Sequence, residues 1–342
     1  MSGGWNTIES DAGVFTYLLD KLGVEGVQFE ELLSLDVQTL AELNPVYGII
    51  FLFKFPTNAP YVGDGGVPRD GKFDHDAAER IFFAHQTIQN ACGTQALLSV
   101  ILNKALGPDG ETPEGAPVKV GGHLGTFLEF AMNLPPDLRG EALSNDELIR
   151  EVHNSFAKSS PFVDETQRPS DPSDADDVFH FIAYTATKGH LYELDGLQPA
   201  PIDHGPCDEN NAVEFAERAI AAVQRRIARY GADEIHFNLM AAVRDRRLAA
   251  RELGDAELLA AEARKRRDWQ FENALRRHNF VGFSHEVLEG VVENKLREGA
   301  DDAADPEKAY KKWVGTATER YEKRLGDRYR RRHGGGDTEM QD

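Results

Sequence analysis

The sequence is poor in cysteine: Cys92 and Cys207 are the only two among 342 residues. So few cysteines give no support for a disulfide framework and cannot build a thiolate metal site. Long apolar runs are also missing. The longest one, within Val46–Phe55, falls far short of the roughly 18–20 residues that a membrane helix needs. With no signal-peptide pattern at the N-terminus, we expect reduced thiols and a location in the cytoplasm and nucleus.

Basic side chains are scarce in the first part of the chain. Residues 1–243 hold 16 basic and 37 acidic side chains, whereas residues 244–333 hold 22 basic and 18 acidic ones. An acidic body repels nucleic acid and attracts a basic protein partner, although solubility alone would also explain it. Neither glycine-rich stretch, GDGGVPRDGK or GPDGETPEG, has the Gly-Lys-Ser/Thr of a phosphate loop. We therefore predict no cofactor, no metal, no nucleic acid and no membrane partner.

Helix and strand patterns alternate along the first 243 residues. Asp11 can cap a helix that ends at Gly23, and Ser144 with Glu147 reads as a capping box. The uniformly apolar Val46–Phe55 predicts a buried central strand, and RIFFAHQ (Arg80–Gln86) a second strand. Further strands are expected in VFHFIAYTATKGHLYELDGL and IHFNLMAAV, and a helix in NNAVEFAERAIAAVQRRIARYG. This mixture indicates an α/β or α+β fold in which helices cover a sheet.

Composition divides the chain into three parts. Residues 1–243 form the expected main domain, which contains a long Pro-, Ser- and Asp-rich loop at 158–177. Residues 244–333 are dense in Ala, Leu, Arg and Glu, which predicts long, exposed helices. Residues 334–342 are expected to be disordered.

Cys92 lies where an apolar helix pattern begins, in FFAHQTIQNACGTQALLSVIL. Asn90 can cap that helix, which would put Cys92 in its first turn, where free N–H groups and the helix dipole stabilise a thiolate. Gly93 lets other groups approach the sulfur. A small buried hydrophobe is the alternative. Cys207, among acidic residues in a turn, has nothing to lower its pKa and is expected to be inert.

A candidate base for Cys92 follows from the geometry of a hairpin. If Lys188-Gly189 is a two-residue turn, Thr187 faces His190. Counting back along the two strands places Asp195 on the same face as His180, as its diagonal neighbour. Diagonal Cβ atoms lie about 7 Å apart, which a carboxylate and an imidazole can bridge. A His180–Asp195 pair is predicted, either catalytic or structural.

Gln86 ends the predicted strand before the helix of Cys92, so its amide could donate to the same space as the Cys92 N–H. Together the two donors would form an oxyanion hole.

The motifs around these candidate residues resemble those of a known family. QTIQNACGTQALLSV is similar to the active-site signature of the ubiquitin carboxyl-terminal hydrolases, which are cysteine proteases of the peptidase C12 type. The resemblance continues through five further motifs, in order along the chain: WNTIESDAGVFTYLL, GIIFLFKF, LSNDELIREVHNSFA, FHFIAY and LYELDGL…PIDHG. After Val243 the chain resembles the longer, proteasome-associated subfamily, whose helical tail docks on a partner.

The resemblance implies a function and a role for each candidate. The chain would be a deubiquitinase with Cys92 as nucleophile, His180 as base, Asp195 as its orienting partner and Gln86 as oxyanion donor. The fold would be a six-stranded, mainly antiparallel sheet between helices, papain-like in arrangement, with a knotted chain and a crossover loop at 158–177. The tail at 244–333 would meet a proteasomal ubiquitin receptor or a related chromatin-remodelling subunit.

Two other readings stay open at this stage. The chain could hydrolyse another ubiquitin-like modifier, or it could be a mainly non-catalytic ubiquitin-binding assembly subunit.

Overall fold

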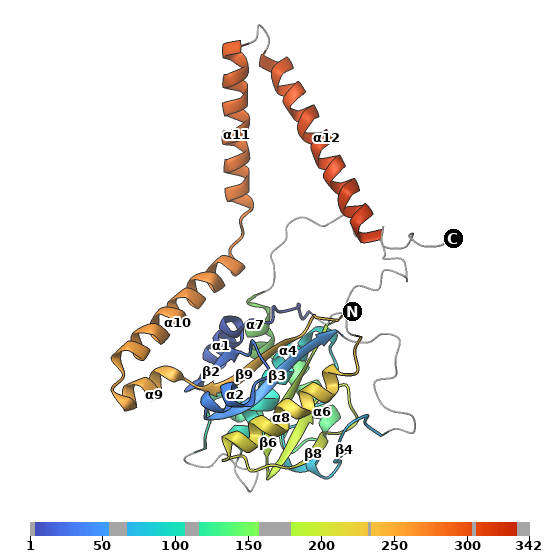
Figure 1. The fold of residues 1–342 in the computed structure, drawn as a ribbon, viewed down its shortest axis with the longest axis vertical. Coiled ribbons are helices and arrows are strands. Elements are labelled where there is room, and N and C mark those ends of the chain that lie inside the picture. The colour runs from blue at the N-terminus through green and yellow to red at the C-terminus, as the bar shows by residue number, and fades with distance from the viewer. Residues whose placement is uncertain are drawn as a thin grey trace, which may run out of the picture. The chain divides into compact units, whose positions relative to one another are not determined.

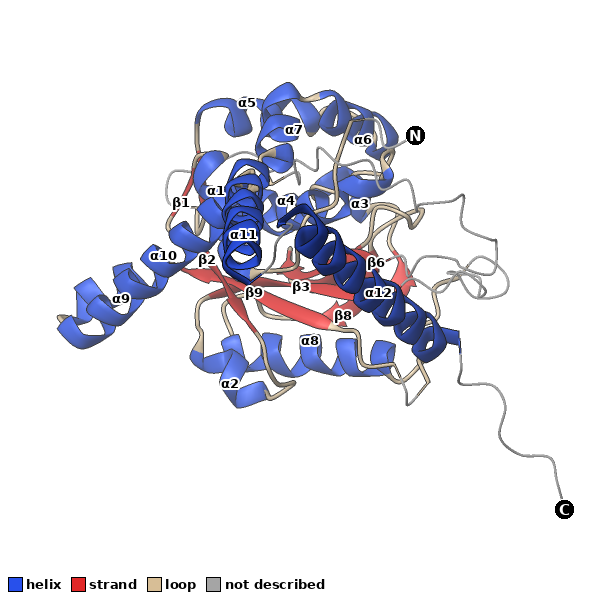
Figure 2. Ribbon diagram, turned by 90° about the horizontal axis from the view of Figure 1, so that it is seen from above, coloured by secondary structure: helices blue, strands red, loops and turns tan. Residues whose placement is uncertain are grey.

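A seven-stranded sheet lies between two layers of helices (Figures 1 and 2). The structure, a computed structural model, describes residues 4–54, 67–106, 116–156, 179–231, 234–302 and 306–333. In spatial order the strands are β2 (Val27–Glu31), β9 (Asn238–Arg244), β3 (Val46–Lys54), β6 (Phe179–Thr187), β7 (His190–Leu194), β8 (Ile202–Pro206) and β4 (Lys72–Phe73). Each neighbouring pair is antiparallel.

The helices divide between the two faces of this sheet (Figure 2). One face is covered by α2 (Val37–Glu42) and α8 (Ala212–Ile227). The other carries α1 (Ala12–Lys21), α4 (Cys92–Ala105), α5 (Gly122–Ala131), α6 (Pro136–Asn145) and α7 (Glu147–Asn154). Short elements complete this part: β1 (Val24–Glu25) pairs with β5 (Lys119–Val120), and α3 (Ala77–Arg80) and a 3-10 turn (Gln89–Ala91) precede α4.

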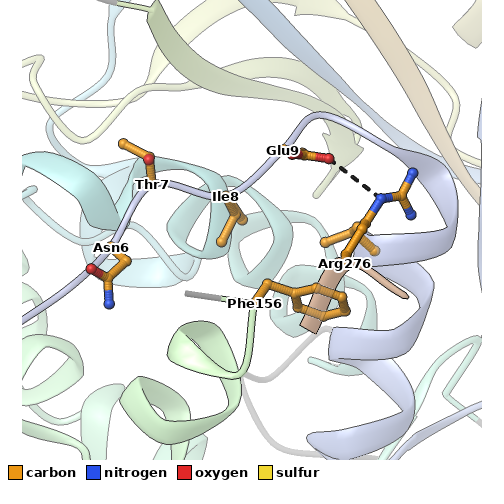
Figure 3. A pocket seen from close by; sticks show the side chains of 7 residues that line it. Asn6, Thr7, Ile8, Glu9, Phe156 and Arg276 are labelled. Atoms are coloured by element: carbon orange, nitrogen blue, oxygen red, sulfur yellow. Dashed lines mark ion pairs between the residues drawn. The ribbon is translucent and has the colours of Figure 1, made fainter. Parts of the chain in front are cut away.

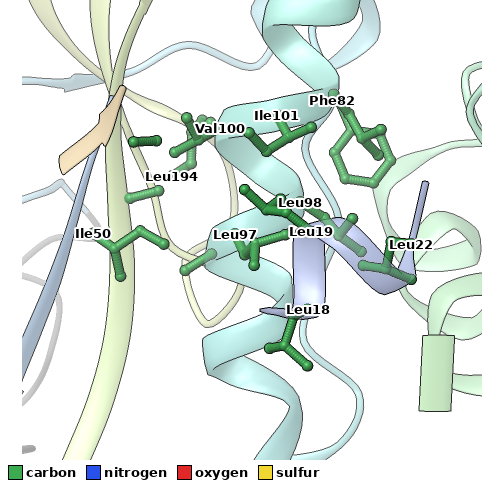
Figure 4. Packing of buried hydrophobic residues seen from close by; sticks show 14 of the residues in the cluster. Leu18, Leu19, Leu22, Ile50, Phe82, Leu97, Leu98, Val100, Ile101 and Leu194 are labelled. Atoms are coloured by element: carbon green, nitrogen blue, oxygen red, sulfur yellow. The ribbon is translucent and has the colours of Figure 1, made fainter. Parts of the chain in front are cut away.

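Helix α4 is the centre of the larger core (Figure 4). All of its residues are buried, because α1 covers one side of it and the sheet the other. Leu97 and Leu98 of α4 lie between Leu18 of α1 and Ile50 of β3. Cys92 is therefore the first residue of a helix that is buried along its whole length.

The predicted central strand and hairpin are confirmed. β3 lies between β9 and β6, buried along most of its length. Lys188 and Gly189 have positive φ angles of 52° and 79°, which fit a two-residue hairpin turn whose twist matches that of the strands. Thr187 pairs with His190, the register that the sequence predicts.

The strand predicted at Arg80–Gln86 is wrong. Phe82–Gln86 runs without a strand partner, because side chains and loops satisfy its backbone groups. The expected count of six strands is wrong as well. A seventh, two-residue strand, β4, pairs with β8 at the edge, in a Gly- and Asp-rich segment that shows no strand pattern.

Two predicted caps are wrong. Asn90 does not cap α4; its amide donates to the Trp5 carbonyl at 3.0 Å. Ser144 does not cap α7 either, because it lies inside α6, and Asp146 accepts the Ile149 N–H instead. The predicted Asp11 cap of α1 is confirmed.

The helices that follow β9 are less exposed than expected. α9 (Arg246–Leu253) ends at Gly254, whose φ of 68° breaks the helix, and α10 (Ala256–Arg277) follows. α10 packs on α1 so closely that a Cβ at Gly13 would come within 2.7 Å of Trp269. Asn273 donates to the Gly13 carbonyl at 2.9 Å. Length and composition predicted a helix here. Its buried face is polar, so the sequence has no apolar stripe that would have predicted the contact with α1.

The chain divides into two compact units. One contains residues 1–159 and 163–278, and the other contains 160–162 and 279–342, with α11 (Val281–Asp302) and α12 (Pro306–His333). The predicted crossover loop at 158–177 and tail at 334–342 lie outside the described residues, so the knotted path also stays a prediction. Within the described part of the chain, no helix is long and apolar enough to span a membrane.

The N-terminal segment is fixed beside α4 by a buried histidine, His153. Its Nε2–H donates to the Asn6 carbonyl at 2.5 Å, and its Nδ1 accepts the Thr94 hydroxyl at 2.7 Å. The Trp5 ring packs against the imidazole, with centroids 4.7 Å apart. Burial lowers the pKa of His153 to about 4, although the bond to Asn6 favours the protonated form.

Stability should therefore fall in mild acid. Below its ordinary pKa of about 6.5, His153 binds a proton in the unfolded chain but not in the folded one. Lowering the pH from 7 to 5 should cost about 2 kcal/mol of unfolding free energy through this residue. Denaturant titrations should show a smaller loss in His153→Gln and an unchanged loss in His75→Gln, an exposed control. Equal losses in His153→Gln and wild type would show that the folded state does not keep His153 neutral.

Candidate active site

Cys92 is the first residue of α4, and 8% of it is exposed. This position confirms the prediction that it lies in the first turn, where backbone N–H groups have no partner within the helix. Gly93 allows a close approach: a Cβ there would come within 2.8 Å of Ile8 and 3.4 Å of Phe181. The thiol is therefore held where α4, the N-terminal segment and the start of β6 meet.

His180 and Asp195 form the pair that the hairpin register predicts. The His180 Nε2–H donates to Asp195 Oδ1 at 2.7 Å. Both side chains are buried, with 4% and 0% exposure. The same carboxylate oxygen accepts the Leu197 N–H at 3.0 Å, so the turn after β7 fixes Asp195. Asp195 thereby sets the orientation of the imidazole.

The imidazole of His180 also interacts with Cys92. A hydrogen bond joins it to the Cys92 thiol, while its Nε2 is bound to Asp195. Burial by itself lowers the pKa of His180. The Asp195 charge and the hydrogen bonds to Asp195 and Cys92 outweigh it and raise the pKa to about 9. A raised pKa favours the protonated, positively charged form of His180 at neutral pH.

A second layer of contacts supports the imidazole from the far side. The edge of Phe53 meets the ring of His180, with centroids 5.8 Å apart and planes at 87°. The Arg226 guanidinium lies 4.3 Å from the Phe53 ring centre and pairs with the buried Glu193. This packing across β3 and β6 supports the ring of His180.

Gln86 lies before α4, as predicted, but in an extended loop rather than at a strand end. Its backbone N–H donates to the Gly196 carbonyl at 2.8 Å, one residue after Asp195. Its side-chain Nε2 donates to the Ile88 carbonyl at 3.0 Å. An amide nitrogen carries two hydrogens, so this bond also fixes the orientation of the second N–H.

A pocket of about 350 Å³ lies along the N-terminal segment beside Ile8 (Figure 3). Arg276 of α10 lines it and pairs with Glu9 at 3.3 Å and with Asp11 at 2.7 Å. Phe156 forms its lower edge in this view. The sequence did not indicate Ile8 or Arg276 as neighbours of the site, because Ile8 meets Gly93 far along the chain and Arg276 lies 265 positions from Asp11.

Other candidates carry no chemistry of this kind. Burial and nearby Glu214 raise the pKa of the Cys207 thiol to about 11, which agrees with its reading as inert. Among the residues that the structure describes, no group of three or more His, Cys, Asp and Glu side chains is arranged to hold a metal ion.

A thiol at the start of a buried helix, hydrogen-bonded to a histidine that a carboxylate orients, is the arrangement of thiol-dependent hydrolases. The family model described as "Ubiquitin carboxyl-terminal hydrolase, family 1" matches residues 5–228, and a second, "Ubiquitin carboxyl-terminal hydrolases", matches residues 254–296. The chain therefore belongs to the ubiquitin carboxyl-terminal hydrolase family and is a thiol-dependent deubiquitinase.

Individual relatives agree with this assignment. The chain is 47% identical to ubiquitin carboxyl-terminal hydrolase 2 of Schizosaccharomyces pombe, over 85% of this chain and 92% of that protein. It is 36% identical to ubh-4 of Caenorhabditis elegans, over 88% and 92%. Trichinella spiralis UCH37, solved with ubiquitin vinyl methyl ester, matches with 30% identity and a TM-score of 0.56, over 80% of this chain and 99% of that one.

The pH dependence of turnover should report the His180–Asp195 pair. The imidazolium is lost above a pH of about 9, so kcat/KM for a ubiquitin–fluorophore substrate should decline there. Asp195→Asn removes the charge that raises the pKa of His180, so the alkaline decline should move to lower pH. The rate should fall without vanishing. An alkaline limb that stays in place in Asp195→Asn would contradict this electrostatic account.

Proposed function

We propose that Cys92 is the nucleophile, His180 the general acid and base, Asp195 its orienting partner and Gln86 an oxyanion donor. The observation that carries this proposal is the continuous hydrogen-bonded series from the Cys92 thiol through His180 to Asp195. The position of Cys92 at the N-terminus of α4 supports the same roles, since N–H groups in the first turn of a helix have no partner within it and can donate to an oxyanion.

The reaction then proceeds in two halves. The Cys92 thiolate attacks the carbonyl carbon after which the bond is cleaved, at the C-terminal glycine of ubiquitin. The Cys92 N–H and the Gln86 amide hold the negative oxygen, and the His180 imidazolium protonates the leaving amine. Neutral His180 next removes a proton from water, and the hydroxide attacks the thioester and expels the Cys92 thiolate. The new carboxyl group of ubiquitin loses its proton to solvent. The thiolate and the imidazolium are then restored.

Replacing the nucleophile separates catalysis from binding. Cys92→Ala should remove turnover of a ubiquitin–fluorophore substrate and still bind ubiquitin, because the sulfur contributes to bond-making and little to the contact surface. Cys207→Ala is the matched control and should keep full turnover. A ubiquitin vinyl methyl ester, the probe bound by the Trichinella spiralis proteins, should label wild type and fail on Cys92→Ala.

The same probes separate the alternatives. If a probe made from another ubiquitin-like modifier and the same electrophile labelled the enzyme in preference to the ubiquitin probe, that modifier would be the substrate in place of ubiquitin. Residual turnover or labelling in Cys92→Ala would remove Cys92 from its role.

We propose further that residues 244–333 recruit the enzyme to a proteasomal ubiquitin receptor or to a related chromatin-remodelling subunit, in the cytoplasm and nucleus. The second family match, at 254–296, covers α10 and most of α11. Apolar side chains on α11 support a docking role: Phe283, Val287, Leu288 and Val291 are between 39% and 65% exposed.

Two truncations should act differently. Deleting residues 279–342 removes α11 and α12 and should abolish recovery of the partner while hydrolysis of a ubiquitin–fluorophore continues. Deleting residues 244–342 also strips α10 from α1, including the Asn273 and Arg276 contacts, and should lower the thermal midpoint as well. Co-purification and thermal unfolding measure the two effects. Partner recovery that survives the shorter deletion would contradict docking through α11 and α12.

A further inference from the structure

The segment that leads to Gln86 is fixed by side chains in place of a strand. Asn103 of α4 accepts the Phe82 N–H at 2.8 Å and donates to the Phe82 carbonyl at 2.9 Å. Gln95, also of α4, donates to the Ala84 carbonyl at 2.5 Å. Both side chains belong to the helix that begins with Cys92, so the sulfur and this segment share one support.

Arg139 of α6 holds the same segment from the opposite side. Its Nη1 donates to the carbonyls of Ile81 and Phe83 at 3.0 and 3.2 Å, and to that of Ala78 at 2.7 Å. Its Nε donates to the Ala131 carbonyl at 3.0 Å. The residue is 1% exposed. A buried guanidinium that serves main-chain carbonyls fixes several of them at once, because its N–H groups lie in one plane.

The contact with α6 continues up to the residue before Gln86. The His85 N–H donates to the Pro136 carbonyl at 2.8 Å. A Cβ at Gly140 would come within 1.9 Å of the His85 carbonyl oxygen, so α6 touches this backbone directly. On the other side, a Cβ at Gly196 would come within 2.9 Å of the Gln86 nitrogen. Gln86 is thus held between α6 and the turn that contains Asp195.

We propose that Arg139 is a positioning residue for the reaction: it fixes Ile81–Phe83 against α6 so that the Gln86 amide meets the oxyanion formed at Cys92. The inference rests on the proposed role of Gln86. An oxyanion donor acts over a hydrogen-bond length, so a shift of its backbone weakens it steeply. Arg139 binds the carbonyl of Phe83, three residues before Gln86, and so acts on Gln86 through the main chain without touching substrate.

A double-mutant cycle in the full chain tests the coupling. Gln86→Ala should lower kcat by about 10²–10³. Arg139→Met should lower kcat by roughly ten- to hundredfold with little change in KM. The double variant should be little slower than Gln86→Ala alone, because Arg139 has no donor left to position. Alkylation of Cys92 by iodoacetamide, which forms no oxyanion, should keep its rate in all three variants.

Two further variants guard against a general loss of structure. Arg139→Lys retains the charge but reaches fewer carbonyls, so it should fall between wild type and Arg139→Met in kcat. If Arg139→Met does not fold, Arg139→Lys takes its place in the double-mutant cycle. Arg266→Met removes a comparably buried arginine from α10 and should lower the thermal midpoint without the drop in kcat.

The outcomes separate the inference from its premise. The positioning role of Arg139 is overturned if the effects of Gln86→Ala and Arg139→Met on kcat multiply, or if alkylation of Cys92 slows together with kcat. In either case Gln86 keeps its proposed role as oxyanion donor. If Gln86→Ala leaves kcat unchanged, the proposed function of Gln86 fails first.

Discussion

The hydrogen bond between His180 and Asp195 is the interaction on which the site depends. It lies within the buried part of the sheet, where a lone imidazolium would be costly and a nearby carboxylate offsets that cost. The same bond fixes Nε2 on Asp195, and the imidazole is also hydrogen-bonded to the Cys92 thiol. The elements around it, from the β6–β7 hairpin to Phe53 beneath the ring, keep two charged groups together away from water.

Backbone hydrogen bonding shapes the opposite wall of the site. Phe82–Gln86 approaches Gly196 but forms no ladder, so its polar groups need partners of another kind. Asn103, Gln95 and Arg139 supply them from two helices. Side-chain partners leave the segment free of the fixed register of a sheet, and this allows Gln86 to approach the start of α4 from the side of Asp195.

The extension after β9 contributes to the catalytic unit and also extends beyond it. α10 covers α1, and its Arg276 binds Asp11, the residue that caps α1. Glu9, which also pairs with Arg276, follows Ile8, whose side chain covers Gly93 beside the sulfur. α11 and α12 form a separate unit with exposed apolar side chains. A boundary drawn on composition alone would separate α10 from the unit that it stabilises.

The sequence by itself determined the short-range features of this protein. The turn at Lys188-Gly189 set the hairpin register, and register alone brought His180 and Asp195 together, since side chains alternate with period two. Apolar spacing also placed Cys92 at the start of a helix. The tertiary structure decided the rest: that Phe82–Gln86 is a loop, that Asp146 rather than Ser144 caps α7, and that α10 packs on α1. The loop and the packing of α10 depend on polar contacts between distant residues, such as Arg139 with Phe83 or Arg276 with Asp11, which leave no period in the sequence.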